Sequence, residues 1–408
     1  MKRFFQGERT NALFTSLSIA LILLVSGWTS LKGAVDWMVF GLALATVLLI
    51  PPVARKDPQM MVPWPMAALA ALPFVAGVIA DPGLFTEMAA YVTAAAMAII
   101  VVVELDAFTP VNMNRGFAIT FVVATTMTVA GLWEVLRWFW DLTFDTGFVE
   151  SNDDLMWQLI AATSVGVVAG IGFDRYLERL PGMDRLPDEL ETEDAENQFE
   201  ETGDAVSSVL SKFGFATEDE RRLTRLLQGV LVAIALIGLL TLNVDVVVSA
   251  GIGIAATALP SLFERNYDFQ IDPALTLWIA VAVVFHALGT LWLYQTLWGW
   301  HNIAHATTGS LVAGIGYTVL RTIEAHTASV SFPPKFTAVF VVIFVFAVGV
   351  GWEILEFTLD QVTVALTGEE MLLTQHGLQD TMSDLVANTV GALVVAVAAT
   401  VYRVRSGT

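Results

Sequence analysis

Long apolar stretches recur along the whole chain. Twelve stretches of about 20 residues, separated by short polar segments, can be marked at 11–31, 35–54, 63–80, 85–105, 116–140, 155–175, 223–242, 245–263, 273–293, 301–321, 336–357 and 383–402. An apolar helix of about 20 residues crosses the hydrocarbon core of a bilayer and satisfies its own backbone hydrogen bonds there. The pattern predicts an all-α, polytopic integral membrane protein with about 12 transmembrane helices.

One acidic segment interrupts this pattern. Residues 178–220 carry fourteen acidic side chains, which is typical of a solvated linker. We expect a cytoplasmic linker at 178–222 with a short amphipathic helix at Val206–Phe215; partner docking is the less favoured alternative. The linker would separate an N-terminal six-span repeat at 1–177 from a C-terminal six-span repeat at 223–408.

The distribution of basic residues predicts the orientation. With the N-terminus inside, eighteen of the twenty Lys and Arg residues fall in cytoplasmic segments, and only Lys32 and Arg137 fall outside. Lys and Arg are retained on the cytoplasmic side. We therefore expect a multi-pass protein of the plasma membrane with both termini in the cytoplasm.

The two halves resemble each other in sequence. Phe117–Asp141 aligns without gaps on Phe336–Asp360, and further on Glu150, Asp154 and Gln158 match Asp380, Asp384 and Asn388. An even number of spans per copy gives a parallel repeat. All five histidines lie in the second copy, and Arg137 replaces Glu356, where it could pair with Glu134 three residues earlier. We expect the second copy to hold the site and the first to serve mainly in packing.

Composition narrows the function classes. The chain is 56% hydrophobic and 15% charged, with a net charge of −20 and no cysteine. These values argue against a soluble domain and exclude both a nucleic-acid binder that neutralises phosphates and any thiolate or disulfide chemistry. The excess of Arg over Lys on an acidic background resembles salt-adapted, halophilic proteins.

Ionisable residues gather near the expected outer ends of the last three spans. His301 and His305 are four residues apart, Glu353 and Glu356 are three apart, and a further set is spaced by four: His376, Asp380, Asp384 and Asn388. Such spacings place each group on one helical face. An ionisable residue inside a span costs about 2.5–3.5 kcal/mol on insertion scales, so several together indicate a site.

Imidazoles and carboxylates suit a divalent metal ion, here Zn, Mn or Fe(II). The candidate metal ligands are His301, His305, Glu353 and Asp384. The candidate catalytic residues are Glu356 and Asp380, and the residues expected to line the site are His376, Asn388, Gln375 and Trp300. The alternative is that these groups only hydrogen-bond between helices.

Other polar and aromatic residues favour a structural interpretation. Lone His286 is expected to be a packed, hydrogen-bonded residue. The aromatic residues that follow span nine, Trp292, Tyr294, Trp298 and Trp300, are typical of an interfacial belt rather than a cofactor wall.

The second half resembles the YjdF-like inner-membrane proteins, six-span proteins without an established activity. The similarity lies in Trp300–His305, in Trp352–Glu356 and in the segment from Gln375 to Asp384, with His301 standing where that family tends to have Asp. Asp384–Gly391 also resembles a segment of the VanZ-like membrane proteins. Both resemblances imply a membrane protein and a shared motif, without a substrate.

Three functions remain open. The first is a metal-dependent enzyme in the membrane that acts on a lipid or envelope component at the outer leaflet, with a spare carboxylate as general base. The second is a twelve-span secondary transporter, although carrier sites usually lie at the midplane between the halves. The third is a non-catalytic scaffold or sensor. The expected partner is the lipid bilayer, with a lipid-like substrate in the first case and no nucleic acid in any.

Overall fold

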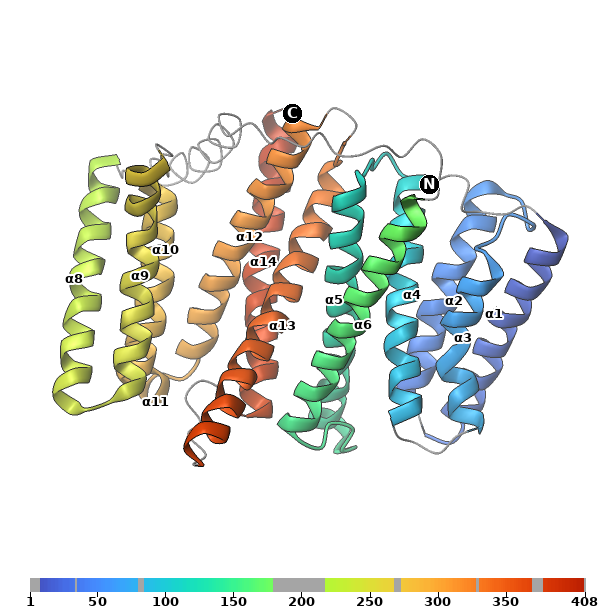
Figure 1. Cartoon of the computed structure of the whole chain (residues 1–408), viewed down its shortest axis with the longest axis horizontal. Helices are drawn as coiled ribbons and strands as arrows, with labels where there is room; N and C mark the ends of the chain where they lie inside the picture. The colour runs from blue at the N-terminus through green and yellow to red at the C-terminus, as the bar shows by residue number, and fades with distance from the viewer. Residues whose placement is uncertain are drawn as a thin grey trace. The chain divides into compact units, whose positions relative to one another are not determined.

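The described part of the chain is helical almost throughout. The computed structural model describes residues 8–33, 35–79, 84–178, 217–267, 273–327, 330–368 and 377–406. Within these ranges there is no β-strand, and an isolated bridge joins Asn112 to Ser331. The chain divides into two compact units (Figure 1): unit 1 comprises Met1–Leu186 with Ser329–Pro333, and unit 2 comprises Pro187–Ala328 with Pro334–Thr408.

Each unit contributes its own set of helices. In unit 1 these are α1 (Arg9–Ser30), α2 (Val35–Arg55), α3 (Trp64–Ile79), α4 (Leu84–Phe108), α5 (Arg115–Phe144) and α6 (Asn152–Glu178). In unit 2 they are α8 (Thr217–Thr241), α9 (Val244–Tyr267), α10 (Pro273–Leu288), the π-helical segment η2 (Gly289–Leu293), α11 (Tyr294–Thr296), α12 (Trp300–His326), α13 (Pro334–Thr367) and α14 (Leu378–Ser406).

The predicted all-α membrane architecture is confirmed. Eleven helices in the described part of the chain are long and apolar enough to cross a membrane, and the twelfth apolar helix, α3, is shorter at 16 residues. Large apolar side chains cover their outer faces, with Val168 69% and Leu240 85% exposed. Lipid solvates such a surface, whereas water would not, so the fold is that of a polytopic α-helical membrane protein.

Polar side chains join the helices of unit 1. Asn11 and Thr15 of α1 are buried, and both donate to the carbonyl of Val62, at 3.2 and 2.9 Å. The Asn11 side-chain oxygen also accepts a 2.7 Å hydrogen bond from the backbone N–H of Trp64, the first residue of α3. A first-turn N–H has no partner inside its own helix. Asn11 therefore supplies that partner and fixes α1 against α3.

Polar contacts at both ends of α5 hold α5 and its connection to α6. Arg115, at the start of α5, forms a 2.5 Å ion pair with Asp174 of α6. At the other end of α5, the Asp141 carboxylate accepts backbone hydrogen bonds from Phe148 (2.7 Å) and Val149 (2.9 Å). Asp141 thus orders the connection from α5 to α6.

In unit 2, α12 and α14 approach each other through glycines. A Cβ atom built on Gly391 would lie 2.0 Å from the carbonyl oxygen of Ala306, and one on Gly309 would lie 2.3 Å from the carbonyl oxygen of Asn388. Only residues without a side chain allow backbones this close, as in small-residue crossings of membrane helices. This crossing places the first turns of α12 beside α14.

Several expectations concern residues outside the described ranges. The proposed amphipathic helix at Val206–Phe215 lies there, as do Gln375 and His376. The described part of the chain resumes at Thr217, where α8 begins. The domain boundaries at 177 and 222 remain predictions.

Candidate metal site

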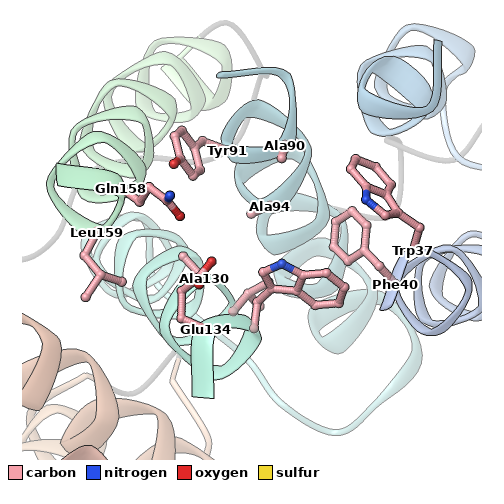
Figure 2. Close-up of a pocket in the computed structure, with 11 residues that line it drawn as sticks. Trp37, Phe40, Ala90, Tyr91, Ala94, Ala130, Glu134, Gln158 and Leu159 are labelled. Atoms are coloured by element: carbon pink, nitrogen blue, oxygen red, sulfur yellow. The ribbon is translucent and has the colours of Figure 1, made fainter. Parts of the chain in front are cut away.

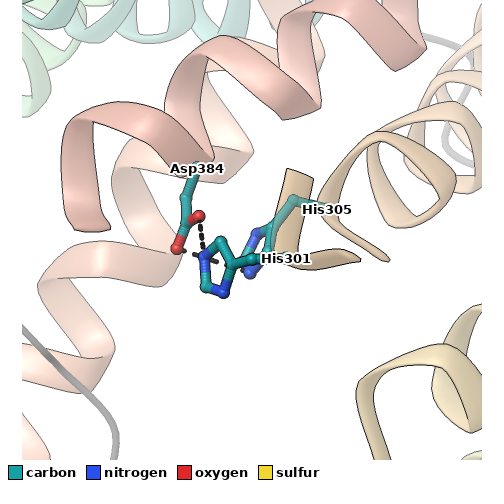
Figure 3. Close-up of side chains that lie close together, drawn as sticks. All are labelled: His301, His305 and Asp384. Carbon is teal, nitrogen blue, oxygen red and sulfur yellow. Dashed lines mark hydrogen bonds and ion pairs between the residues drawn. The ribbon is translucent and has the colours of Figure 1, made fainter. Parts of the chain in front are cut away.

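Two histidines of α12 and an aspartate of α14 meet beside the glycine crossing (Figure 3). His301 is hydrogen-bonded through Nε2 to Asp384, and His305 Nε2 lies 3.4 Å from the second Asp384 oxygen. One ligand atom from each of the three residues lies within 4.8 Å of the others. Two ligands at tetrahedral zinc are also about 3.4 Å apart, given bonds of about 2.1 Å. The separation of His305 and Asp384 therefore matches that of two ligands of one ion.

The two imidazoles are stacked because they lie one turn apart on α12. Their ring centroids are 4.5 Å apart with an interplanar angle of 27°. The His305 side chain is 12% exposed and that of Asp384 only 4%, whereas that of His301 is 28% exposed. The site thus runs from an accessible edge at His301 to a closed interior at His305 and Asp384.

A second aspartate of α14 lies at the accessible edge. Asp380 is one turn before Asp384, and its carboxylate is 3.3 Å from His301 Nε2. The side chain of Asp380 is 25% exposed. Asp380 therefore contacts His301 from the accessible side of the cluster.

The predicted ligand Glu353 reaches the same helix from α13. Its side chain is 1% exposed and hydrogen-bonded to Thr381 of α14. The other carboxylate oxygen, Oε1, is buried without a hydrogen-bond partner in the described part of the chain. Glu353 does not belong to the three-residue group around Asp384. It is an adjacent acceptor with one free oxygen.

Glu356 and Asn388 extend the polar region along α13 and α14. The Glu356 side chain is hydrogen-bonded to Trp352, which is 48% exposed. Asn388, one turn beyond Asp384, has a buried Oδ1 without a hydrogen-bond partner among the described residues. Both flank the cluster, Glu356 from α13 and Asn388 from α14.

Carboxylates dominate the electrostatics of the site. The charged groups that act on Glu353 are Glu356, Asp384 and Asp380. Negative charges this close repel one another strongly where water is excluded. A divalent cation would offset that repulsion, and the mixed imidazole and carboxylate set suits Zn, Mn or Fe(II).

Two residues without a site signal in the sequence, His286 and Tyr294, pack against the histidines. His286 is packed and hydrogen-bonded as expected, but its ring lies edge-on to His305 with centroids 4.8 Å apart. Its two nitrogens are bonded to Tyr294 (2.8 Å) and Thr308 (3.0 Å), so neither is free for a metal. The Tyr294 ring also packs on His301, at 4.9 Å. Tyr294 therefore contacts the cluster rather than serving only as part of an interfacial belt.

A π-helical segment positions Tyr294. Helix α10 passes into η2, and a Cβ atom on Gly289 would lie 2.2 Å from the Tyr294 ring. Isolated π-helical turns inside α-helices frequently occur at functional sites. Here the wider turn and the missing side chain of Gly289 admit the tyrosine ring next to His286.

The other aromatic residues of this region are peripheral. Trp298 is 98% and Trp292 63% exposed, which suits an interfacial belt. The indole N–H of Trp300 donates to the carbonyl of Phe285 at 3.0 Å, and its ring packs on Phe285. Trp300 thus anchors the start of α12 to α10.

In unit 1, Arg137 pairs with Glu134, as the sequence predicted. Arg137 donates to both carboxylate oxygens of Glu134, at 3.1 and 2.9 Å. The Glu134 side chain is 8% exposed. A largely buried ion pair therefore neutralises the Glu134 carboxylate.

The fold and the cluster define a polytopic membrane protein with a partly buried group of His and Asp residues. A family described as "Predicted membrane protein (DUF2238)" matches residues 223–405, which include the whole cluster. A second family, described as "Domain of unknown function (DUF8268)", matches residues 1–61. No curated protein and no solved structure matches the chain. The comparisons support a membrane protein family in the second half.

Proposed function

We propose that unit 2 is a metal-dependent enzyme that acts on a lipid or envelope component within the membrane. The observation that carries the proposal is the convergence of ligand atoms from His301, His305 and Asp384 within 4.8 Å of one another. A bound divalent ion would polarise a substrate bond and make water a stronger nucleophile. The apolar surroundings suit a substrate with an acyl or isoprenoid chain.

In this proposal each residue of the site has its own role. His301, His305 and Asp384 hold the ion, and Glu353 is the nearby carboxylate, with a free Oε1 that can bind the ion or accept a proton. Asp380 lies in contact with His301 at the accessible edge and passes protons to and from the surroundings. Glu356 is a second general acid or base, and Asn388 is a hydrogen-bonding group of the lining.

Metal binding requires a change at His301. Because the Asp384 carboxylate can only accept, the His301 Nε2 donates its proton in the hydrogen bond between them. The same nitrogen must lose that proton to become a ligand: a neutral imidazole moves it to Nδ1, whereas a doubly protonated imidazole must release one proton. Affinity for Zn²⁺ should therefore fall as the pH is lowered.

A structural role for the cluster is the second candidate. The hydrogen bonds of Asp384 to His301 and of Glu353 to Thr381 join α14 to α12 and α13 without any metal. Interhelical hydrogen bonds of this kind stabilise membrane bundles by about 1–2 kcal/mol. A purely structural cluster would need these interhelical hydrogen bonds but no bound metal ion.

Asp384→Asn separates the two candidates because it keeps the shape and removes the charge. The matched control is Asp154→Asn in α6, whose carboxylate is bonded locally to Ser151. The metal proposal predicts stoichiometric Zn, Mn or Fe in the wild type and the control, and a loss in Asp384→Asn. A chelator should then lower the melting temperature of the wild type and of Asp154→Asn, and leave that of Asp384→Asn unchanged. Equal metal content in all three proteins, or none in any, would contradict the proposal.

The enzymatic step needs a separate measurement. Vesicles made from the lipids of the native membrane are incubated with Zn²⁺ and either the wild type or Asp384→Asn, and the lipids are compared by mass spectrometry. The proposal predicts a product formed by the wild type alone. If both proteins leave the lipids unchanged while the wild type binds metal, the site binds an ion without this chemistry.

The membrane location, the orientation of the termini and the family resemblances are also proposals. Placement in the plasma membrane with both termini in the cytoplasm rests on the Lys and Arg distribution, and reporter fusions at each terminus test it. The parallel repeat, the halophilic character and the resemblance to YjdF-like and VanZ-like proteins rest on the sequence.

A further inference from the structure

Unit 1 contains a pocket that the proposed function of unit 2 does not use. It has an empty volume of about 510 Å³, part of it open to the surroundings, and lies among α2, α4, α5 and α6. The lining residues are Trp37, Phe40, Ala90, Tyr91, Ala94, Val129, Ala130, Trp133, Glu134, Gln158 and Leu159. The surface of this pocket is therefore mostly aromatic and aliphatic.

The aromatic side of the pocket is a continuous wall. Phe40 packs on Trp133 with ring centroids 5.1 Å apart, and Trp37 lies edge-on to Phe40 at 6.5 Å. Small residues, Ala90, Ala94 and Ala130, leave space in front of these rings. Flat rings beside empty space accommodate a hydrocarbon chain or a branched isoprenoid.

The opposite side carries the polar groups. Figure 2 shows Tyr91, Gln158 and Glu134 on that side of the pocket, away from Trp37 and Phe40. Within the described part of the chain, the Tyr91 hydroxyl and the Gln158 amide have no hydrogen-bond partner. Polar groups in an apolar pocket lose free energy unless they are paired. A ligand that hydrogen-bonds to them would supply the missing partner.

The charge of the pocket indicates an uncharged ligand. The only ionised group in the lining is Glu134, and both of its oxygens already accept from Arg137, at 3.1 and 2.9 Å. This pair leaves no net charge to attract a cation or an anion. Burial of a phosphate or an ammonium group here would therefore be unfavourable.

The depth of the polar groups leads to the same conclusion. Tyr91 lies seven residues inside α4 and Gln158 six residues inside α6, which corresponds to about 9–10 Å along each helix at 1.5 Å per residue. A charged lipid head group stays at the interface, whereas a hydroxyl or carbonyl can lie one or two helical turns below it.

We infer that the pocket of unit 1 binds a neutral amphiphile, an apolar chain that ends in a hydroxyl or carbonyl group held by Tyr91 and Gln158. In the alignment of the two halves, Glu134 and Gln158 stand opposite Glu353 and Asn388. Unit 1 would thus retain a binding pocket at the repeat position where unit 2 has its polar cluster. The inference does not depend on a metal in unit 2.

Three compounds that share the farnesyl chain and differ in the head group test whether the pocket prefers an uncharged ligand. The full-length protein in detergent is photolabelled with a diazirine analogue of farnesol, and farnesol, farnesyl phosphate and farnesylamine compete. We expect labelled peptides from the four helices of the pocket, and competition by farnesol at concentrations at least 10-fold below those of the two charged compounds. Equal competition by all three, or labels spread over the outer surface, would overturn the inference.

Conservative variants test the residues. Tyr91→Phe removes only the hydroxyl and should weaken farnesol competition about 2- to 10-fold, the value of one neutral hydrogen bond. Gln158→Leu should act similarly. The control is Tyr176→Phe, near the other end of α6, where the tyrosine is 41% exposed. The melting temperature shows whether Tyr91→Phe is folded. If farnesol competes for labelling of the folded Tyr91→Phe variant as well as it does for the control, the assignment of the polar groups is wrong.

Discussion

The close crossing of α12 and α14 leads to a quantitative prediction for Gly391→Ala. The added Cβ atom would lie 2.0 Å from the carbonyl oxygen of Ala306, the neighbour of His305. An ordinary carbon–oxygen contact needs about 3.3 Å, so the backbones must separate by about 1.3 Å. Overpacking of this kind costs about 1–3 kcal/mol. For a unit of this size the melting temperature should fall by about 2–12 °C.

The same displacement should weaken metal binding. Asp384 lies seven residues, about 10 Å, from Gly391 along α14, so a part of the separation reaches the site. Metal–ligand distances tolerate deviations of about 0.2 Å. Even half of the displacement exceeds that limit. We expect Zn²⁺ affinity to fall about 10- to 100-fold, the range found when groups that orient metal ligands are altered.

The matched control is Gly251→Ala in α9, where a Cβ atom would have nothing within 4 Å. Alanine there should leave stability unchanged or raise it by up to about 1 kcal/mol through helix propensity. Thermal unfolding in detergent and Zn²⁺ titration against a competing chelator measure both effects. If Gly391→Ala melts and binds Zn²⁺ like Gly251→Ala, the crossing does not control the site.

Three further predictions concern other groups. Arg137→Met should destabilise unit 1 by about 3–5 kcal/mol because it removes the positive charge that neutralises the buried Glu134 carboxylate; the double variant with Glu134→Gln should recover most of that loss in thermal unfolding, and no recovery would refute the pairing argument. Tyr294→Phe removes the hydrogen bond to His286 and should weaken Zn²⁺ binding about 10-fold or more by loosening His305; unchanged affinity would assign Tyr294 to packing alone. Zn²⁺ at 100 times its Kd should stabilise the wild type by about 2.7 kcal/mol, and the same titration should leave the unfolding of Asp384→Asn unmoved.

Much of the site could be predicted from spacing within single helices. His301 and His305 lie on one face of α12, and Asp380, Asp384 and Asn388 lie on one face of α14. The α-helical repeat fixes such relations once a segment is helical. The pairing of Arg137 with Glu134 follows from the same rule and is confirmed.

The contacts between helices could not be predicted in this way. The approach of Tyr294 to His286 and His301 depends on the π-helical turn at η2, and hydropathy carries no signal for a change in helix type. The hydrogen bond from Thr381 to Glu353 depends on how α13 and α14 are rotated about their axes. The pocket of unit 1 lies in a half that the sequence assigned mainly to packing, because side chains from four helices must be placed before an empty volume exists.

The sequence alone determined that this chain is a bundle of membrane-spanning helices with its histidines in the second half, because the bilayer admits few structures for long apolar segments and helical periodicity orders their side chains. Only the tertiary structure decided which polar groups meet. That choice depends on backbone approach at Gly309 and Gly391, where residues some eighty positions apart must fit within a few ångströms.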